Sequence, residues 1–242
     1  MSVYVLVHGA WHGGWCWQRV ASRLRAAGHE VYTPTLTGLG ERVHLAHPGV
    51  NLTTHVTDVL NVLRYEDLSD VVLVGHSYAG LVITGVVAEM PERVGHLVYL
   101  DAFLPRPGQS VHHLLAPDTA AAQRQAAERD GDGWRVPPFV SIFGLTDPND
   151  LEWASPKFTP HPLGTPTETL TYSTPLEDQP FSRTYILATA PVRPHFAAAY
   201  ASIEQHPAWR VEQIATGHDI MLTRPEELTQ SLLALVSRPA PT

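Results

Sequence analysis

A serine between an apolar run and a helix-like stretch constrains the fold of this chain most strongly. The apolar run is Val71–Val74, the serine is Ser77 in Gly75-His76-Ser77-Tyr78-Ala79-Gly80, and the helix-like stretch covers 81–87. This order predicts a sharp turn from a buried strand into a helix. A serine hydroxyl is a weak nucleophile unless a base and backbone N–H groups lie beside it. The segment indicates a nucleophilic serine, although the same order also occurs in ordinary packing of a strand and a helix.

The turn differs from the usual Gly-x-Ser-x-Gly pattern at its last position. Ala79 stands where the second glycine is expected, and Gly80 follows it. One additional methyl group is compatible with a tight turn, so we expect Ser77 to keep its place.

A second apolar run ends in a glycine-rich loop. The run Val3–Val7 predicts a strand, and His8-Gly9-Ala10-Trp11-His12-Gly13-Gly14 follows it. A loop of this kind beside the serine supplies one N–H of an oxyanion hole, and the residue after the serine supplies the other. We therefore predict that the N–H groups of Ala10 and Tyr78 bind the oxyanion.

A histidine near the end of the chain has the position expected for a general base. His218 lies in Ala215-Thr216-Gly217-His218-Asp219, after the strand-like run 209–214 and before a helix that begins at Pro225. A histidine that follows a strand lies at the same edge of a parallel sheet as Ser77. We predict that His218 accepts the proton of Ser77.

Short apolar runs alternate with helix-like stretches in both terminal parts of the chain. We expect further strands at 30–34, 97–100 and 183–188, and helices at 15–27 and 52–64. This alternation predicts an α/β fold, with a mostly parallel sheet, helices on both faces and a site at the carboxyl ends of the strands. A length of 242 residues suits a single domain.

The composition changes between Pro105 and Pro180, where proline is frequent and a helical piece at 119–129 is rich in alanine. We predict a core formed by 1–104 and 181–242, and a cap inserted at 105–180 that folds over the serine. With Trp11 of the first loop, the aromatic residues expected to line a substrate pocket are Trp134, Phe139, Phe143, Trp153 and Phe158. Each of them is equally compatible with a hydrophobic cluster under a long loop.

Charge and hydropathy exclude several classes of partner. The net charge is −8, from 16 basic and 24 acidic residues without a basic run, so we expect no nucleic-acid partner. No apolar stretch reaches the roughly 18 residues of a membrane span, and the first strand begins too close to Met1 for a signal peptide. Cys16 is the single cysteine, which fits a reducing compartment. We expect a cytoplasmic protein without metal or cofactor, for which a homodimer is a possible assembly.

With these residues in view, the chain resembles the plant-type hydroxynitrile lyase and methyl-ester esterase branch of the α/β-hydrolases, which includes methyl salicylate esterases and bacterial esterases. The resemblance rests on 5–15, on 73–77 and on Gly217-His218 with Met221-Leu222 following, and it is weak through the cap. It implies an α/β-hydrolase fold, with Ser77 as nucleophile and His218 as general base.

Two positions separate lyases from esterases in this branch. Lyases carry a threonine close after the first-loop histidine and a lysine directly after the catalytic histidine, whereas this chain has Gly9-Ala10 and Asp219 there. An acidic residue beside the base opposes a departing anion such as cyanide. The resemblance therefore favours an esterase, and Ser77 in place of an aspartate disfavours dehalogenase and epoxide hydrolase chemistry.

The acid of the triad departs from the family pattern. Relatives carry an aspartate just after the strand that corresponds to 185–189, but no carboxylate occurs from Thr184 to Ser202. Some α/β-hydrolases place the acid at the end of the preceding strand, where this chain has Asp101. A carboxylate there reaches the second nitrogen of the base and fixes its tautomer, so we predict Asp101 as the acid. Its other possible role is to cap the loop that enters the cap. Weaker candidates for the acid are Asp219, Asp178 and Glu204.

Together these inferences predict a serine hydrolase that cleaves a small or medium carboxylic ester, such as a methyl ester, an aryl ester or a lactone, through an acyl-enzyme. The alternatives are a hydroxynitrile lyase or a carbon–carbon bond hydrolase with the same triad, and a receptor that kept the fold without catalysis. A receptor need not keep all three triad residues, so trapping of Ser77 by a fluorophosphonate separates it from an enzyme.

Overall fold

A parallel sheet forms the centre of the computed structural model, which describes residues 1–236 and leaves 237–242 of the predicted core outside the described residues. The strand order is β2-β1-β3-β4-β7-β8, and every neighbouring pair is parallel. The strands are β1 (Val3–Val7), β2 (Glu30–Tyr32), β3 (Val71–His76), β4 (Val94–Leu100), β7 (Ser182–Ala188) and β8 (Arg210–Ile214).

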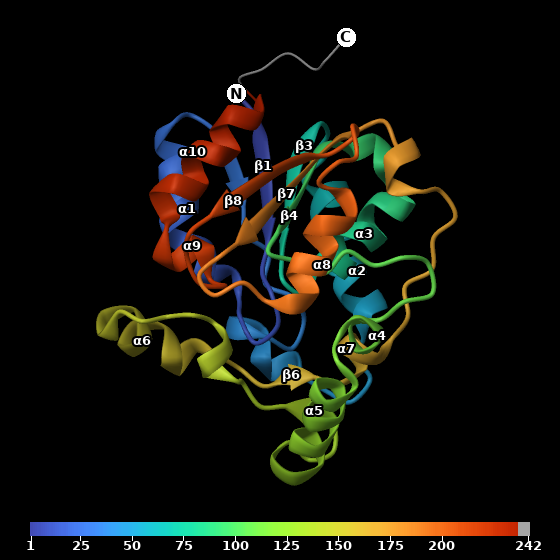
Figure 1. The fold of residues 1–242 in the computed structure, drawn as a ribbon, viewed down its shortest axis with the longest axis vertical. Coiled ribbons are helices and arrows are strands. Elements are labelled where there is room, and N and C mark those ends of the chain that lie inside the picture. Colours follow the sequence, from blue (N-terminus) through green and yellow to red (C-terminus); the bar gives the residue numbers. More distant parts are fainter. Residues whose placement is uncertain (237–242) are drawn as a thin grey trace.

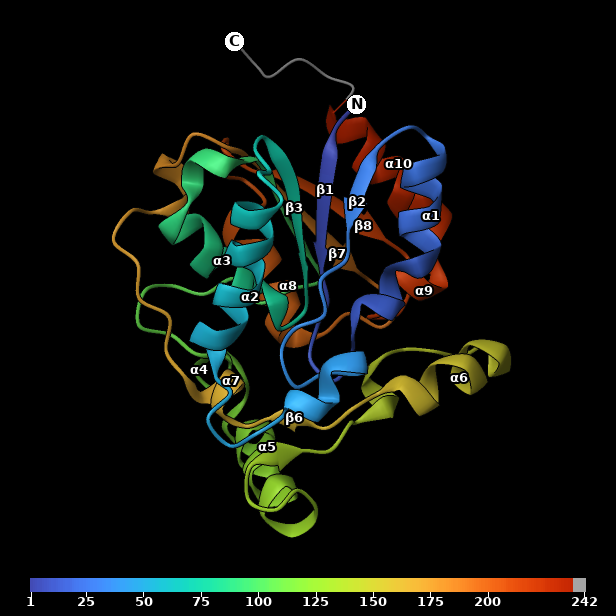
Figure 2. The same cartoon turned by 180° about the vertical axis from the view of Figure 1, so that it is seen from behind.

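Helices cover both faces of this sheet, because each parallel connection must cross over a face. As Figure 1 and Figure 2 show, one layer consists of α1 (Gln18–Ala26), α9 (Ile220–Thr223) and α10 (Pro225–Val236). The other consists of α2 (Leu52–Tyr65), α3 (Ala79–Glu89) and α8 (Pro194–Ile203). This arrangement confirms the predicted α/β architecture.

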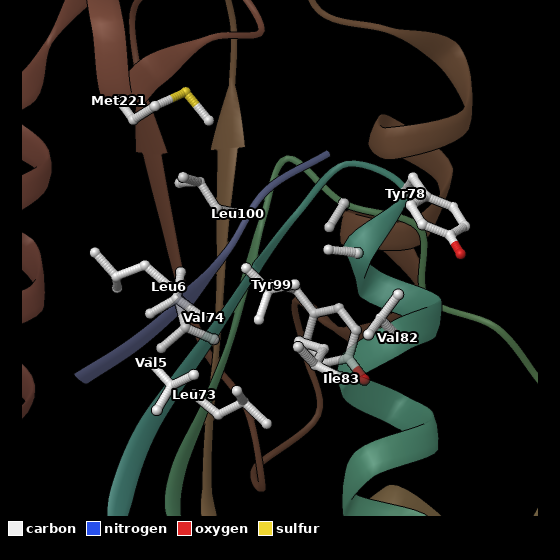
Figure 3. Close-up of a cluster of buried hydrophobic side chains, with 14 of the residues drawn as sticks. Val5, Leu6, Leu73, Val74, Tyr78, Val82, Ile83, Tyr99, Leu100 and Met221 are labelled. Carbon is white, nitrogen blue, oxygen red and sulfur yellow. The ribbon is translucent and has the colours of Figure 1, made fainter. Parts of the chain in front are cut away.

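The core fixes the turn that carries Ser77. Every residue of β3 is buried, and so is every residue of α3 from Ala79 to Val87. Figure 3 shows side chains of β1 and β3 in one buried cluster with Val82 and Ile83 of α3. A helix that is apolar on all sides must be enclosed, and α3 is enclosed between the sheet and α2. The strand before Ser77 and the helix after it are therefore both rigid.

Much of the segment between β4 and β7, including α5, α6 and β6, lies beyond the carboxyl ends of the strands, at the bottom of Figure 1, and its last part returns along the side of the molecule to the start of β7. Its helices are α4 (Val111–Leu114), α5 (Pro117–Asp130), α6 (Pro148–Ala154) and α7 (Gly164–Thr167). Its two short strands, β5 (Arg135–Val136) and β6 (His161–Pro162), pair with each other in antiparallel fashion and are separate from the main sheet. The boundaries 105–180 of the cap stay a prediction.

Two predicted elements are shorter in the structure. The expected helix 15–27 begins as a 3₁₀ turn at Gly14–Trp17 and becomes α-helical only at Gln18. The expected strand 30–34 ends at Tyr32, since Pro34 has no N–H to continue a ladder.

Candidate active site

Ser77 occupies the turn between β3 and α3 in a left-handed backbone conformation, with φ of 55°. Such a conformation is unfavourable for a residue with a side chain, and it persists here because the backbone on both sides is held. The N–H of Ser77 donates to Leu100 O at 3.2 Å, and its own carbonyl accepts from the N–H of Phe103 at 3.1 Å. The turn therefore lifts the Ser77 side chain out of the strand.

Gly80, rather than residue 79, needs to be a glycine in this turn. A Cβ at Gly80 would lie 2.0 Å from the carbonyl oxygen of Phe103. Ala79 is fully buried with its methyl group accommodated. The shift of the motif by one position thus has a steric reason.

Ser77, His218 and Asp101 form one chain of hydrogen bonds. Ser77 Oγ lies 2.9 Å from His218 Nε2, and His218 Nδ1 lies 2.6 Å from Asp101 Oδ2. A carboxylate only accepts, so Nδ1 carries the proton and Nε2 is free to accept from the serine hydroxyl. All three side chains are buried, with relative exposures of 9%, 4% and 1%.

Asp101 is held at the end of β4 by the neighbouring strand β7. Its N–H donates to Ile186 O at 2.7 Å, and its Oδ1 accepts from the N–H of Ala188 at 3.1 Å. Its backbone is left-handed, with φ of 42°. The backbone of β7 thus fixes Asp101 Oδ1, and this contact directs Asp101 Oδ2 toward His218.

The first loop brings the N–H of Ala10 to the same place. No residue of 1–236 accepts a hydrogen bond from the N–H of Ala10 or of Tyr78. His8 Nε2 accepts from the N–H of Leu36 at 3.0 Å, so Nδ1 carries the proton and donates to Gly9 O at 2.8 Å. That carbonyl belongs to the same trans peptide as the Ala10 N–H and points the opposite way. Burial lowers the pKa of His8 to about 3, which keeps it neutral.

A cavity of about 420 Å³ opens above these groups. Ala10, Ser77, Tyr78 and His218 line it, together with mainly apolar side chains of the cap. Its volume suits a small or medium organic molecule. Among the predicted pocket residues, Trp11 and Phe139 line it.

The other four predicted pocket aromatics lie outside the lining of the cavity. Phe143 and Phe158 pack on each other, with ring centroids 4.5 Å apart, and both contact the His12 ring. Trp153 packs on Trp15 at 5.4 Å, and Trp134 lies beside the Arg135 guanidinium. Phe143, Phe158 and Trp153 thus join the cap to the core and fit a hydrophobic cluster under a long loop, whereas the contact of Trp134 lies within the cap.

Three residues that follow β7 lie at the site and were not predicted from the sequence. Phe196 stacks on His218, with centroids 5.1 Å apart and planes 14° apart. Arg193 and His195 line the cavity beside it. Arg193 lies directly before α8, and His195 and Phe196 lie in the first turn of that helix, after the carboxyl end of β7. The general rule for parallel sheets therefore indicated the place, even though no motif marked the residues.

Asp219 is fully buried and lies outside the cavity lining, where its carboxylate meets His12. It therefore does not face a bound substrate. No group of three or more His, Cys, Asp or Glu residues within 1–236 is arranged to hold a metal ion. None of the described helices is long and apolar enough to cross a membrane.

Comparison with known proteins extends these observations. The model of the Alpha/beta hydrolase family matches residues 4–230. A carbendazim hydrolyzing esterase of Nocardioides sp. (strain SG-4G) is 40% identical, and the alignment covers 97% of this chain and 100% of that protein. Salicylic acid-binding protein 2 of Nicotiana tabacum is 28% identical over 97% of each chain.

Solved structures show the same fold. An extracellular alpha/beta-hydrolase of a Paenibacillus species superimposes with a TM-score of 0.85 at 24% identity, over 97% of this chain and 98% of that one. A pyrethroid hydrolase of Sphingobium faniae JZ-2 gives 0.74 at 22% identity, over 99% and 98%. With the family model covering nearly the whole sequence, this chain belongs to the alpha/beta hydrolase family.

Proposed function

We propose that Ser77, His218 and Asp101 are the catalytic triad of this carboxylic ester hydrolase. The proposal rests on one observation, the unbroken hydrogen-bond chain from Asp101 through His218 to Ser77 at the floor of a cavity. His218 Nε2 takes the proton of Ser77 as the oxygen attacks the ester carbonyl. The protonated His218, stabilised by Asp101, then gives that proton to the leaving alcohol, and water releases the acyl group by the same route.

The N–H groups of Ala10 and Tyr78 bind the oxygen that becomes negative in each tetrahedral intermediate. Both are free of partners within 1–236 and line the cavity beside Ser77. Donors aimed at this developing charge are worth about 10²- to 10³-fold in turnover each.

The substrate is a small or medium ester with an aryl or other apolar group. The apolar lining of a cavity of about 420 Å³ supports this choice. The names of the relatives agree with it, since they include a carbendazim hydrolyzing esterase and plant methylesterases. The lyase, the carbon–carbon bond hydrolase and the receptor have no comparable support.

Substitution of the nucleophile tests the proposal. Ser77→Ala and His218→Ala should each lower turnover of p-nitrophenyl acetate by up to ~10⁶-fold, and the double variant should be no worse, because the residues act as one unit. Folding is checked by circular dichroism. Hydrolysis by Ser77→Ala at close to the parent rate would show that another residue is the nucleophile.

Two further assays separate the alternatives. A fluorophosphonate should label Ser77 in the parent and nothing in Ser77→Ala, whereas a receptor would not react. Mandelonitrile cleavage at mildly acidic pH should not exceed the background rate, since no lysine follows the base. Cyanide release that disappears in Ser77→Ala would establish a lyase instead.

The remaining expectations concern location and assembly. The lone cysteine, Cys16, is fully buried, and it supports the proposed cytoplasmic location. A homodimer and the lack of a nucleic-acid partner stay predictions from the sequence.

A further inference from the structure

His12 lies between the loop that carries the proposed oxyanion donor and the loop that carries the general base. Its Nδ1 lies 2.7 Å from Ala10 O, and its Nε2 lies 3.0 Å from Asp219 Oδ2. Asp219 directly follows His218 in the chain. Both side chains are buried, with relative exposures of 1% for His12 and 0% for Asp219. The contact spans 207 residues of sequence, so it joins two loops that only the fold brings together.

The hydrogen-bond chemistry requires two protons in this pair. The Ala10 carbonyl can only accept, so His12 Nδ1 must carry a proton. The second proton lies between His12 Nε2 and Asp219 Oδ2. The pair is therefore either imidazolium and carboxylate or neutral imidazole and carboxylic acid, and it is neutral as a whole in both forms. A neutral unit is what such a buried position tolerates.

The pair acts on the peptides that flank Ala10. His8 holds the Gly9 carbonyl on one side of the Ala10 N–H, and His12 holds the Ala10 carbonyl on the other. The side chains of His8 and His12 thus fix two successive peptide planes, so the Ala10 N–H can point in only one direction. Asp219 anchors His12 and is itself held through its N–H, which donates to Phe143 O of the cap at 3.0 Å.

We propose that His12 and Asp219 form a clasp that positions the oxyanion donor Ala10 relative to His218. The inference rests on the proposed function, because it assigns these residues a task in that chemistry. They are positioning residues, since neither lines the cavity. The clasp holds a geometry needed in the transition state, so its loss should lower kcat and leave KM unchanged.

Four variants of Asp219 and His12 separate positioning from mere packing. Asp219→Ala and His12→Ala should each lower kcat for p-nitrophenyl acetate by ~10- to 100-fold, less than deletion of a donor. The double variant should be no worse than His12→Ala, since each change already opens the clasp. Asp219→Asn should retain most of the activity, because its amide N–H can donate to Nε2 of a neutral His12 in the same place.

A tetrahedral probe reads out the oxyanion site directly. Phenylboronic acid forms a tetrahedral adduct with a catalytic serine, so its Kd should weaken in Asp219→Ala by about the same factor as kcat/KM, and recover in Asp219→Asn. His96→Ala is the matched control. It removes a half-buried histidine that hydrogen-bonds Thr184 Oγ1 near the start of β4, and it should lower Tm without changing kcat.

The outcomes distinguish the clasp from the triad. Normal kcat in Asp219→Ala, equal damage in Asp219→Asn and Asp219→Ala, or losses that multiply in the double variant would overturn the clasp while Ser77→Ala stays inactive. Activity that survives in Ser77→Ala would overturn the proposed function and the clasp with it. If His12→Ala does not fold, His12→Phe keeps the ring packing on Phe143 and Phe158 without the hydrogen bonds.

Discussion

In the proposed triad, the acid is Asp101 at the end of β4 and not a residue at the end of the neighbouring strand β7. Because β4 and β7 are parallel neighbours, a residue just past Leu100 lies beside the empty acid position after β7. The left-handed backbone of Asp101 turns its carboxylate toward His218 Nδ1, where the distance is 2.6 Å. At the scale of single residues, a place in the proposed triad thus depends on whether a side chain faces the His218 ring, and not on whether its residue is next to His218 in the sequence.

The two aspartates beside His218 should therefore respond differently to the same change. Asp101→Asn keeps the size but favours the wrong imidazole tautomer, and kcat should fall by ~10³- to 10⁴-fold. Asp219→Asn should cost far less, since it does not touch the catalytic ring. Steady-state kinetics on p-nitrophenyl acetate compares them, and equal losses would remove Asp101 from the triad.

Phe139 should contribute to substrate selection, because it is the cap aromatic that lines the cavity. Phe139→Ala should lower kcat/KM for phenyl esters by roughly 10-fold, as expected for the loss of a buried aromatic contact of about 1–1.5 kcal/mol, and change acetate esters of small alcohols little. Phe143→Leu is the comparison, since Phe143 packs outside the cavity. A parent enzyme that prefers small alkyl esters over aryl esters would contradict this picture.

At the scale of elements, the cap is attached to the loop of the general base. The backbone of Gly144 packs directly on Gly217, so that a Cβ added to Gly144 would lie 2.7 Å from the Gly217 Cα. The carbonyl of Phe143 also accepts from the N–H of Asp219. Trp11 of the first loop donates from its indole N–H to Val136 O of β5 at 2.9 Å. The cap thus fixes two of the three loops of the site.

Gly144→Ala should therefore damage catalysis more than stability. The added methyl group pushes on Gly217 and displaces His218, so kcat should fall by at least ~10-fold, in line with the sensitivity of catalysis to small displacements. Gly108→Ala is the matched control, because Gly108 also has a left-handed backbone, with φ of 83° against 73°, but nothing lies within 4 Å of its Cβ position. Equal loss of activity in both variants would show that backbone strain alone matters.

At the scale of the whole molecule, the fold encloses several neutral histidines in and around the site. Burial lowers the pKa of His8 to about 3 and that of His55 to about 4. Burial also lowers the pKa values of His76 and His161 well below the usual value. Each is hydrogen-bonded in its neutral form; His55, for example, donates to Thr37 O and accepts from the Tyr78 hydroxyl. The native state therefore resists protonation at these four histidines.

Stability should fall as the pH is lowered below about 6.5, the pKa of an unfolded-state histidine. Below that value the unfolded chain binds a proton at each of these histidines while the native chain does not, down to pH about 3 for His8 and about 4 for His55. Each contributes about 1.4 kcal/mol of lost stability per pH unit.

Urea unfolding at pH 7.5, 6.5 and 5.5 measures this effect. His55→Asn should reduce the change of the free energy of unfolding with pH by the contribution of one histidine. His44→Ala, which removes an exposed ring, should leave this pH dependence unchanged. A midpoint that stays constant or rises toward pH 5.5 would contradict the assignment of these rings as neutral.

The sequence by itself predicted the central strands of the sheet and two members of the proposed triad, Ser77 and His218. Continuous apolar runs predicted β1, β3 and β4, because a strand buried on both faces needs continuous apolar residues. Ser77 and His218 could be placed because each follows a predicted strand, and parallel strands deliver their following residues to one edge. The prediction of Asp101 rested on the resemblance to α/β-hydrolases that carry the acid at the end of this strand, together with the lack of any carboxylate between Thr184 and Ser202.

Only the tertiary structure decided which cap aromatics face the cavity and what Asp219 does. A large apolar residue in an irregular segment has no period that assigns it a face, so Phe139 and Phe143 look alike in the sequence, yet one lines the cavity and the other packs under it. Asp219 borders His218 in the chain, but its side chain turns away to His12, across 207 residues. Contacts of such sequence separation arise from packing between loops, which local patterns do not encode.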